Sequence, residues 1–209
     1  MIGRFITLDG SEGVGKTTQM ANIRQWCEEQ NIVTHFSREP GGTLLGEQLR
    51  TILLDHNTQA DPISELLLFL AARRAHLQNE IIPRLERGEW VICDRYRDAT
   101  YAYQHYGRGI PLETLHSLEH LTETNKEADI AFILGSSNQT AQARLIARSK
   151  EKDRFEIENE AFFMRVAQGY RALSEKPKHY WIDAEGDAQN VFSRILPHLE
   201  KLLPNHTSS

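Results

Sequence analysis

Residues 10–17 read Gly-Ser-Glu-Gly-Val-Gly-Lys-Thr and match the pattern G-x-x-x-x-G-K-[ST] of a phosphate-binding loop. Glycine lets the backbone curl so that successive N–H groups point at phosphate oxygens, and the helix expected to begin near Lys16 adds the positive end of its dipole. The Lys16 ammonium can reach the β- and γ-phosphates of a nucleoside triphosphate, and the Thr17 hydroxyl can bind Mg²⁺. The predicted ATP-binding residues are Gly10, Ser11, Glu12, Gly13, Val14, Gly15, Lys16, Thr17 and Thr18.

The loop by itself does not distinguish kinases, ATPases and GTPases, because all of them use it. A GTPase reads guanine through the pattern N-K-x-D. Residues 125–128 read Asn-Lys-Glu-Ala and lack the aspartate, so we reject a GTPase.

Short apolar segments alternate with helical ones on both sides of the loop. Strands are expected near 5–9, 32–37, 90–93, 128–134 and 180–182, with helices between them. This alternation predicts a three-layer α/β/α fold with a five-stranded parallel sheet, the P-loop NTPase fold, because parallel strands need crossover connections. Ligands of such sheets bind beyond the carboxyl ends of the strands, and every motif described here falls there.

Length and composition narrow the class of protein. The chain has 209 residues, which favours one domain over 1–209, and its two cysteines do not form a disulfide framework. A net charge of −5 argues against duplex nucleic acid as a partner. Without a signal-peptide pattern or an apolar run long enough for a bilayer, we expect a cytoplasmic protein that does not bind a membrane.

An acid and a base follow the strand expected at 90–93. Asp94 is placed to contribute to the coordination shell of Mg²⁺. Arg95 is placed to bind a second phosphate in a bidentate manner through its guanidinium. Taken alone, the pair also fits a surface ion pair that ends a strand. Arg38, Arg73 and Arg74 add cations near the same edge, which suits an anionic acceptor.

Taken together, the motifs resemble those of the bacterial thymidylate kinases over nearly the whole chain. The matching segments occur in the family's order: 8–19 (LDGSEGVGKTTQ), 38–43 (REPGGT), 65–73 (ELLLFLAAR), 90–96 (WVICDRY), 102–104 (AYQ), 107–109 (GRG) and 153–156 (DRFE). The segment Arg-Glu-Pro-Gly-Gly-Thr is specific to this family among nucleotide kinases. The resemblance implies phosphoryl transfer from ATP to thymidine monophosphate (dTMP) for dTTP synthesis, with Mg²⁺ as cofactor and a homodimeric enzyme.

The resemblance also implies substrate-binding roles for residues at matching positions. Phe69 would stack on thymine, and Arg73 would donate to the pyrimidine carbonyl. Thr100 and Gln104 would lie near the base edge, while Tyr103 would crowd the 2′ position of the sugar. Arg38 and Arg95 would hold the acceptor phosphate, with Glu12 near the acceptor sugar and Mg²⁺. The alternative for Phe69 is an ordinary core aromatic in an apolar run.

The charged segment at about 148–156 resembles the small mobile lid of the family. The variable positions of the phosphate-binding loop hold no arginine, so Arg148 or Arg154 is expected to neutralise the transferring phosphoryl group. The predicted catalytic residues are Lys16, Glu12, Arg95, Arg148 and Arg154. A solvated charged loop is the alternative reading of the segment.

Two positions depart from the family pattern. Gly135 stands where many members have aspartate, and Ala99 where many have serine. These departures are the only support for a nucleotide-binding relative that has lost catalysis. A kinase for another nucleoside monophosphate is the second alternative, and Phe69, Arg73 and Tyr103 argue against it.

A competing motif lies in the helix expected at 111–124. His116, Glu119 and His120 fit the zinc-protease pattern H-x-x-E-H. The pattern has only three defined positions and no evident third ligand, so zinc chemistry is disfavoured.

Overall fold

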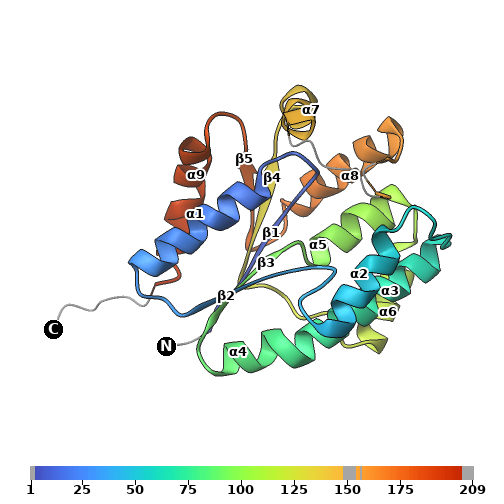
Figure 1. Cartoon of the computed structure of the whole chain (residues 1–209), viewed down its shortest axis with the longest axis horizontal. Coiled ribbons are helices and arrows are strands. Elements are labelled where there is room, and N and C mark those ends of the chain that lie inside the picture. Colours follow the sequence, from blue (N-terminus) through green and yellow to red (C-terminus); the bar gives the residue numbers. More distant parts are fainter. Residues whose placement is uncertain (1–2, 148–153, 156, 204–209) are drawn as a thin grey trace.

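Five parallel strands form the central sheet of the computed structural model, which describes residues 3–147, 154–155 and 157–203. The strands lie in the order β2-β3-β1-β4-β5, and helices cover both faces (Figure 1), which confirms the predicted three-layer fold. Their bounds are β1 (Phe5–Gly10), β2 (Thr34–Arg38), β3 (Trp90–Asp94), β4 (Ile130–Gly135) and β5 (His179–Asp183).

The helices follow the predicted order with local differences. They are α1 (Lys16–Glu29), α2 (Leu44–Leu54), α3 (Pro62–His76), η1 (Leu77–Ile81), α4 (Ile82–Glu86), α5 (Arg97–Thr100), η2 (Tyr101–Gly107), α6 (Leu112–Leu121), α7 (Asn138–Ala147), α8 (Glu160–Leu173) and α9 (Ala188–Glu200). The elements η1 and η2 are π-helical, a wider turn that often occurs at functional sites and that hydrophobic periodicity does not reveal.

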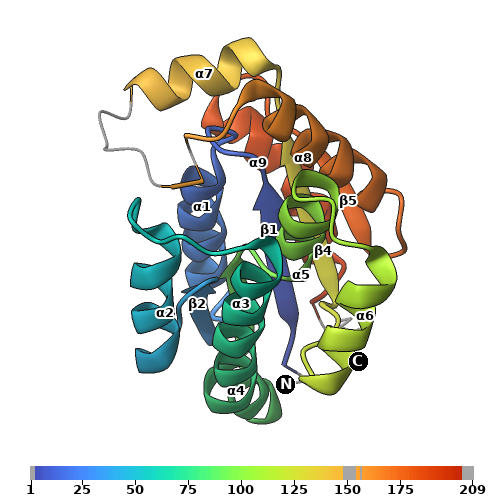
Figure 2. The same cartoon turned by 90° about the vertical axis from the view of Figure 1, so that its right-hand side faces the viewer.

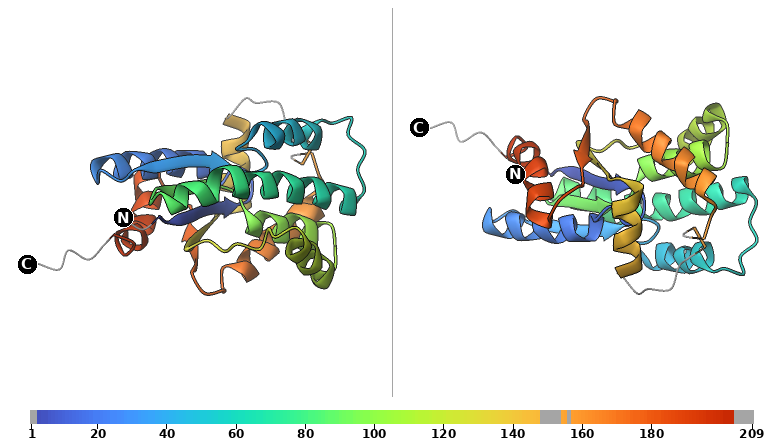
Figure 3. Two further views of the ribbon diagram at one scale, coloured as in Figure 1. Left: turned by 90° about the horizontal axis from the view of Figure 1, so that it is seen from below. Right: turned by 90° about the horizontal axis from the view of Figure 1, so that it is seen from above.

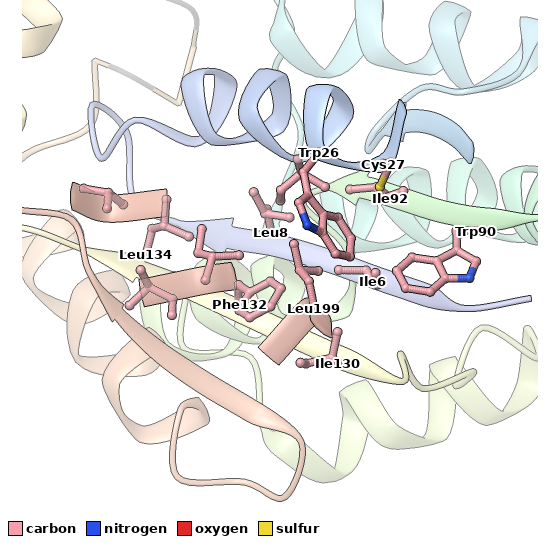
Figure 4. Close-up of a cluster of buried hydrophobic side chains, with 14 of the residues drawn as sticks. Ile6, Leu8, Trp26, Cys27, Trp90, Ile92, Ile130, Phe132, Leu134 and Leu199 are labelled. Carbon is pink, nitrogen blue, oxygen red and sulfur yellow. The ribbon is translucent and has the colours of Figure 1, made fainter. Parts of the chain in front are cut away.

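The largest apolar cluster lies between the sheet and the helices α1 and α9. All six residues of β1 are buried, as expected for a central parallel strand covered on both faces. Figure 4 shows Trp26 and Cys27 of α1 directed at the strands, and the rings of Trp26 and Trp90 lie 6.3 Å apart. Leu199 of α9 completes the cluster from the carboxyl-terminal helix.

The carboxyl ends of the strands meet at one edge of the sheet. In Figure 2 the strands run upward toward α7, and the amino terminus lies at the opposite end. The right-hand view of Figure 3 looks onto α7 at this edge. The phosphate-binding loop follows β1 here, Arg38 ends β2 and Asp94 ends β3.

No helix in the described part of the chain is long and apolar enough to cross a membrane. Cys27 and Cys93 are both buried and form no disulfide.

Packing at the end of β4 explains the unusual Gly135. A Cβ atom built on Gly135 would lie 2.0 Å from Cζ2 of Trp181, so the indole ring fills the space that an aspartate would need. The Arg171 guanidinium covers the Trp181 ring, 4.6 Å from its centroid. Gly135 and Trp181 are therefore a matched pair in this sheet.

Gly135→Asp is expected to destabilise the protein by about 1–3 kcal/mol, the usual effect of overpacking, because Trp181 must move. Urea unfolding monitored by circular dichroism measures the loss. Trp181→Ala supplies the control: once the ring is removed, adding Gly135→Asp should cost less stability than it does in the unmodified chain. Equal midpoints for Gly135→Asp and the unmodified chain would contradict the pairing.

Candidate active site

A cavity of about 730 Å³ opens at the carboxyl edge of the sheet. The phosphate-binding loop lines one end of it, and side chains from α3, α5 and η2 line the other. The predicted site residues that line it are Glu12, Gly13, Val14, Gly15, Lys16, Thr17, Thr18, Arg38, Phe69, Arg73, Asp94, Arg95, Thr100, Tyr103 and Gln104. Gly10, Ser11 and Arg154 do not line this cavity, and Arg148 lies outside the described residues.

The backbone of the phosphate-binding loop needs glycine at two positions. Gly13 and Gly15 have φ angles of 76° and 96°, a region that other residues adopt at a cost. A side chain at Gly13 would also place its Cβ atom 2.4 Å from the Ala141 carbonyl oxygen of α7. The loop therefore approaches α7 closely, with its N–H groups at the start of α1.

Lys16 is tied to this loop. Its Nζ atom donates to the carbonyl oxygens of Gly10 and Ser11, both at 2.9 Å. Burial, together with the positive charge of Arg95, lowers the pKa of Lys16 to about 8. An anionic ligand beside the ammonium would favour its charged form, so bound phosphate and Lys16 would stabilise each other.

The acids at this end lie around Arg95. Arg95 forms an ion pair with Glu12, and its Nη1 atom lies 3.7 Å from Asp94 Oδ1. Asp94 Oδ1 is buried and has no hydrogen-bond partner, so it retains capacity to bind a cation. Arg95 has a φ angle of 64°, an uncommon backbone state for a residue other than glycine. Such strain often marks functional positions.

A further acid lies beneath the loop, at the end of β1. Asp9 is fully buried, and its Oδ1 atom accepts from the Tyr96 N–H at 3.4 Å. Burial and the nearby charge of Asp98 raise the pKa of Asp9 to about 7.

The other end of the cavity contains an aromatic face and a buried guanidinium. Phe69 is half-buried, and its ring lies 5.8 Å from that of Phe155. Arg73 is fully buried: Nε pairs with Glu39 at 2.7 Å, and Nη2 donates to Thr100 Oγ1 at 2.7 Å and to the Tyr96 carbonyl at 3.0 Å. Its Nη1 atom has no hydrogen-bond partner.

Arg38 lies on the exposed rim. Its side chain pairs with Glu47 of α2 at 2.9 Å, and Glu47 also accepts from the Gly42 N–H at 3.1 Å. Among the described residues, the guanidinium of Arg38 pairs with the Glu47 carboxylate, and this pair is exposed at the rim. An anionic substrate could therefore replace Glu47 as the partner of Arg38.

Two arginines of the cavity wall were missed by the sequence analysis. Arg50 of α2 donates to the Pro40 carbonyl at 3.0 Å. Arg144 of α7 donates to the carbonyls of Val14 at 3.3 Å and Ala184 at 3.0 Å, and so joins three elements around the loop. Both lie in ordinary helices with no recognisable motif, so only the tertiary structure reveals them.

Arg154 lies against α3. Its Nη2 atom pairs with Glu65 at 2.8 Å, and Nε donates to the Leu53 carbonyl at 2.9 Å. The guanidinium also covers the Phe155 ring, 4.7 Å from its centroid. In this conformation Arg154 joins its segment to α3 and to the end of α2.

The competing zinc motif does not converge. Glu119 is buried, pairs with Arg97 at 2.8 Å and accepts from Tyr101 Oη at 2.7 Å. His116 and His120 are exposed on the outside of α6. Glu119 thus belongs to an internal network that binds α6 to α5 and η2.

A phosphate-binding loop, strand-end acids and an end lined by an aromatic ring and a buried arginine lie in one cavity, and together they define a P-loop nucleotide kinase. The family model described as thymidylate kinase matches residues 8–195. A protein of Dichelobacter nodosus named thymidylate kinase is 47% identical over 203 residues, covering 97% of this chain and 100% of that protein. A protein of Neisseria meningitidis serogroup B that is also named thymidylate kinase is 42% identical to this chain over 205 residues, covering 97% of each protein.

The solved structures agree with the sequence relatives. The crystal structure of thymidylate kinase from Ehrlichia chaffeensis superposes with a TM-score of 0.77 at 31% identity, covering 95% of this chain and 100% of that one. The chain belongs to the thymidylate kinase family. Both the family resemblance and the predicted enzyme class, a dTMP kinase, are confirmed.

Proposed function

We propose that this single-domain chain transfers a phosphoryl group from Mg²⁺–ATP to dTMP through the residues that line its cavity, giving thymidine diphosphate and ADP for dTTP synthesis. One observation carries the proposal. The side chains of Arg73 and Phe69 line the same cavity as Lys16 and the phosphate-binding loop. A pyrimidine monophosphate bound between them would direct its phosphate toward the loop.

At the donor end, the loop N–H groups and Lys16 hold the β- and γ-phosphates. The backbone is already shaped for this by Gly13 and Gly15. Transfer needs no strong general base, because the attacking oxygen belongs to an already anionic phosphate. Positioning and charge stabilisation therefore supply the rate enhancement.

At the acceptor end, Arg38 and Arg95 hold the phosphate of dTMP. The Arg95 guanidinium must then bind Glu12 and the substrate phosphate at the same time. Arg38 must release Glu47 and bind the substrate phosphate in its place. The Tyr103 ring is buried and packs edge-on to Phe155 at 6.1 Å, so it is rigid enough to exclude a ribose 2′-hydroxyl. Phe69 stacks on the base.

The residues at the loop fit a bound Mg²⁺. Thr17 and Asp94 both line the cavity, and Asp94 Oδ1 is a buried carboxylate oxygen without a hydrogen-bond partner. Oxygen donors of this kind suit Mg²⁺, which also tends to retain several waters. When bound, the ion neutralises charge on the phosphates of ATP.

The remaining positive charge comes from the segment at 148–156. Arg148 and Arg154 are our candidates for the transferring phosphoryl group. Arg154 would have to exchange its contact with Glu65 for the phosphoryl group.

We also propose that the chain forms a homodimer in the cytoplasm and binds no nucleic acid, with α2, α3 and α6 as the paired face. Leu45, Ala71, Ala75 and Leu121 line a shallow apolar hollow between these helices. Leu45 and Leu121 line this hollow and are 49% and 77% exposed, and exposed apolar residues that gather in one patch mark a contact surface. A two-fold axis through the hollow would cover the same leucines on both copies.

The reaction is tested by ADP release in a coupled assay with Mg²⁺–ATP and the monophosphates of thymidine, deoxyuridine, deoxycytidine and deoxyguanosine. We expect strong selectivity for dTMP. Lys16→Ala should abolish turnover, because the β- and γ-phosphates lose their main cation. Turnover with another acceptor alone would establish a different nucleotide kinase. Tight ATP binding without any turnover would indicate an inactive relative.

Phe69→Ala should raise the KM for dTMP by roughly tenfold, because base stacking contributes about 1–3 kcal/mol. The KM for ATP should change little. Phe163→Ala is the matched control, since Phe163 packs on the same apolar cluster outside the cavity. Equal effects of Phe69→Ala on both KM values would exclude the stacking role.

Leu121→Glu should convert the dimer to a monomer in sedimentation velocity, because it places a charge in the apolar hollow. Val33→Glu serves as the control, since Val33 is 67% exposed near the start of β2, on a different element. A dimer that survives Leu121→Glu would place the contact on another face.

A further inference from the structure

Glu65 is a buried carboxylate that the proposed reaction does not use. It lies in the first turn of α3 and is 1% exposed. Gln104 Nε2 donates to it at 3.0 Å, Arg154 Nη2 at 2.8 Å, and Arg108 through Nε and Nη2, both at 3.2 Å. One carboxylate thus joins α3, η2 and the segment at 154.

These contacts determine which way the Gln104 amide points. A carboxylate paired with two guanidinium groups only accepts hydrogen bonds, so the NH₂ group of Gln104 must face it. A flipped amide would put its carbonyl oxygen against a carboxylate oxygen and lose the bond. Gln104 lines the cavity, and its Oε1 atom is the remaining polar atom of the side chain. With its NH₂ group turned toward Glu65, the amide has its carbonyl oxygen on the opposite side, where it can accept a hydrogen bond from a bound base.

Arg73 offers the complementary group at the same end of the cavity. Glu39 binds its Nε atom, and Thr100 and Tyr96 accept from Nη2. The orientation of Glu39 is itself supported by His76, whose Nδ1 atom lies 3.0 Å from Glu39 Oε1. Nη1 makes no hydrogen bond and lies 3.8 Å from Glu119 Oε1. Because a guanidinium has donors and no acceptor, any polar group that Arg73 offers to a ligand in the cavity is a donor. The wall of the pocket thus carries one donor and one acceptor, each oriented by a buried glutamate.

This polarity matches one class of pyrimidine. Thymine and uracil present a carbonyl acceptor at C4 and an N–H donor at N3, whereas cytosine presents an amino donor at C4 and an acceptor at N3. We infer that Glu65 is a specificity-determining positioning residue, which holds the Gln104 amide so that the pocket accepts 4-oxo pyrimidines and rejects 4-amino pyrimidines. The inference rests on the proposed function, because it requires a base between Arg73 and Gln104.

The alternative is that Glu65 only anchors Arg108 and Arg154. Three variants separate the two roles. Glu65→Gln allows the Gln104 amide to flip, because a glutamine can donate as well as accept. Gln104→Met removes the amide that is proposed to bind the base, and it leaves the contacts of Glu65 with Arg108 and Arg154 in place. Arg108→Gln removes an ion pair of Glu65 and leaves the contact with Gln104, so it is the matched control.

The experiment measures kcat/KM for dTMP, dUMP and dCMP with each variant. Glu65→Gln and Gln104→Met should each reduce the preference for dTMP over dCMP at least tenfold, mainly through the acceptor KM, with the KM for ATP unchanged. The preference for dTMP over dUMP should not move, because both bases present the same edge. Arg108→Gln should lower the thermal midpoint and change neither preference.

The inference would be overturned if Glu65→Gln left the preference for dTMP over dCMP unaltered. It would also be overturned if the preference for dTMP over dUMP changed equally, because that result indicates general distortion of the pocket. If Glu65→Gln does not fold, it is combined with Arg108→Gln, which removes one of the two guanidinium groups that would face the uncharged side chain, and the double variant carries the same test. The failure of the proposed function is distinct, because the unmodified chain would then show no preference for dTMP.

Discussion

The parallel register of β2, β3 and β1 is the constraint on which the site depends. Arg38 pairs with Asp94 across β2 and β3, and Asp94 pairs with Leu8 across β3 and β1. β2 and β3 therefore end at the level of Leu8, and β1 continues to Gly10, so the segments that follow all three strands begin at one edge of the sheet. Because a parallel sheet brings equivalent strand ends to the same edge, residues far apart in sequence meet without any local signal.

This convergence concentrates charge in a partly buried place. Arg73 is buried against Glu39, and Glu65 receives two guanidinium groups and one amide. Removing one member of such a group is costly, because the partner charge stays buried without compensation. The networks contribute mainly geometric definition: they hold donors and acceptors in one arrangement before a substrate binds, so less ordering is needed on binding.

The π-helical element η2 shapes the end of the cavity that Phe69 and Arg73 also line. It begins at Tyr101 and carries both Tyr103 and Gln104, each buried and each on the cavity wall. A wider helical turn moves side chains away from the positions of a regular α-helix. Tyr103 can therefore pack among Phe155, Phe162 and Tyr170 while the next residue reaches Glu65.

The sequence by itself determined the strand order along the chain, the phosphate-binding loop, the Asp94-Arg95 pair and the family, because these are encoded in short contiguous patterns. Tertiary structure alone decided that Arg73 is buried against Glu39, that Glu65 faces Gln104, that Arg154 contacts α3, and that Gly135 lies against Trp181. Gly135 departs from the family pattern, and Trp181 occupies the space that a side chain at this position would need. These features depend on side chains from remote segments packing at close range, and no periodicity or local motif encodes which remote residue will be the neighbour.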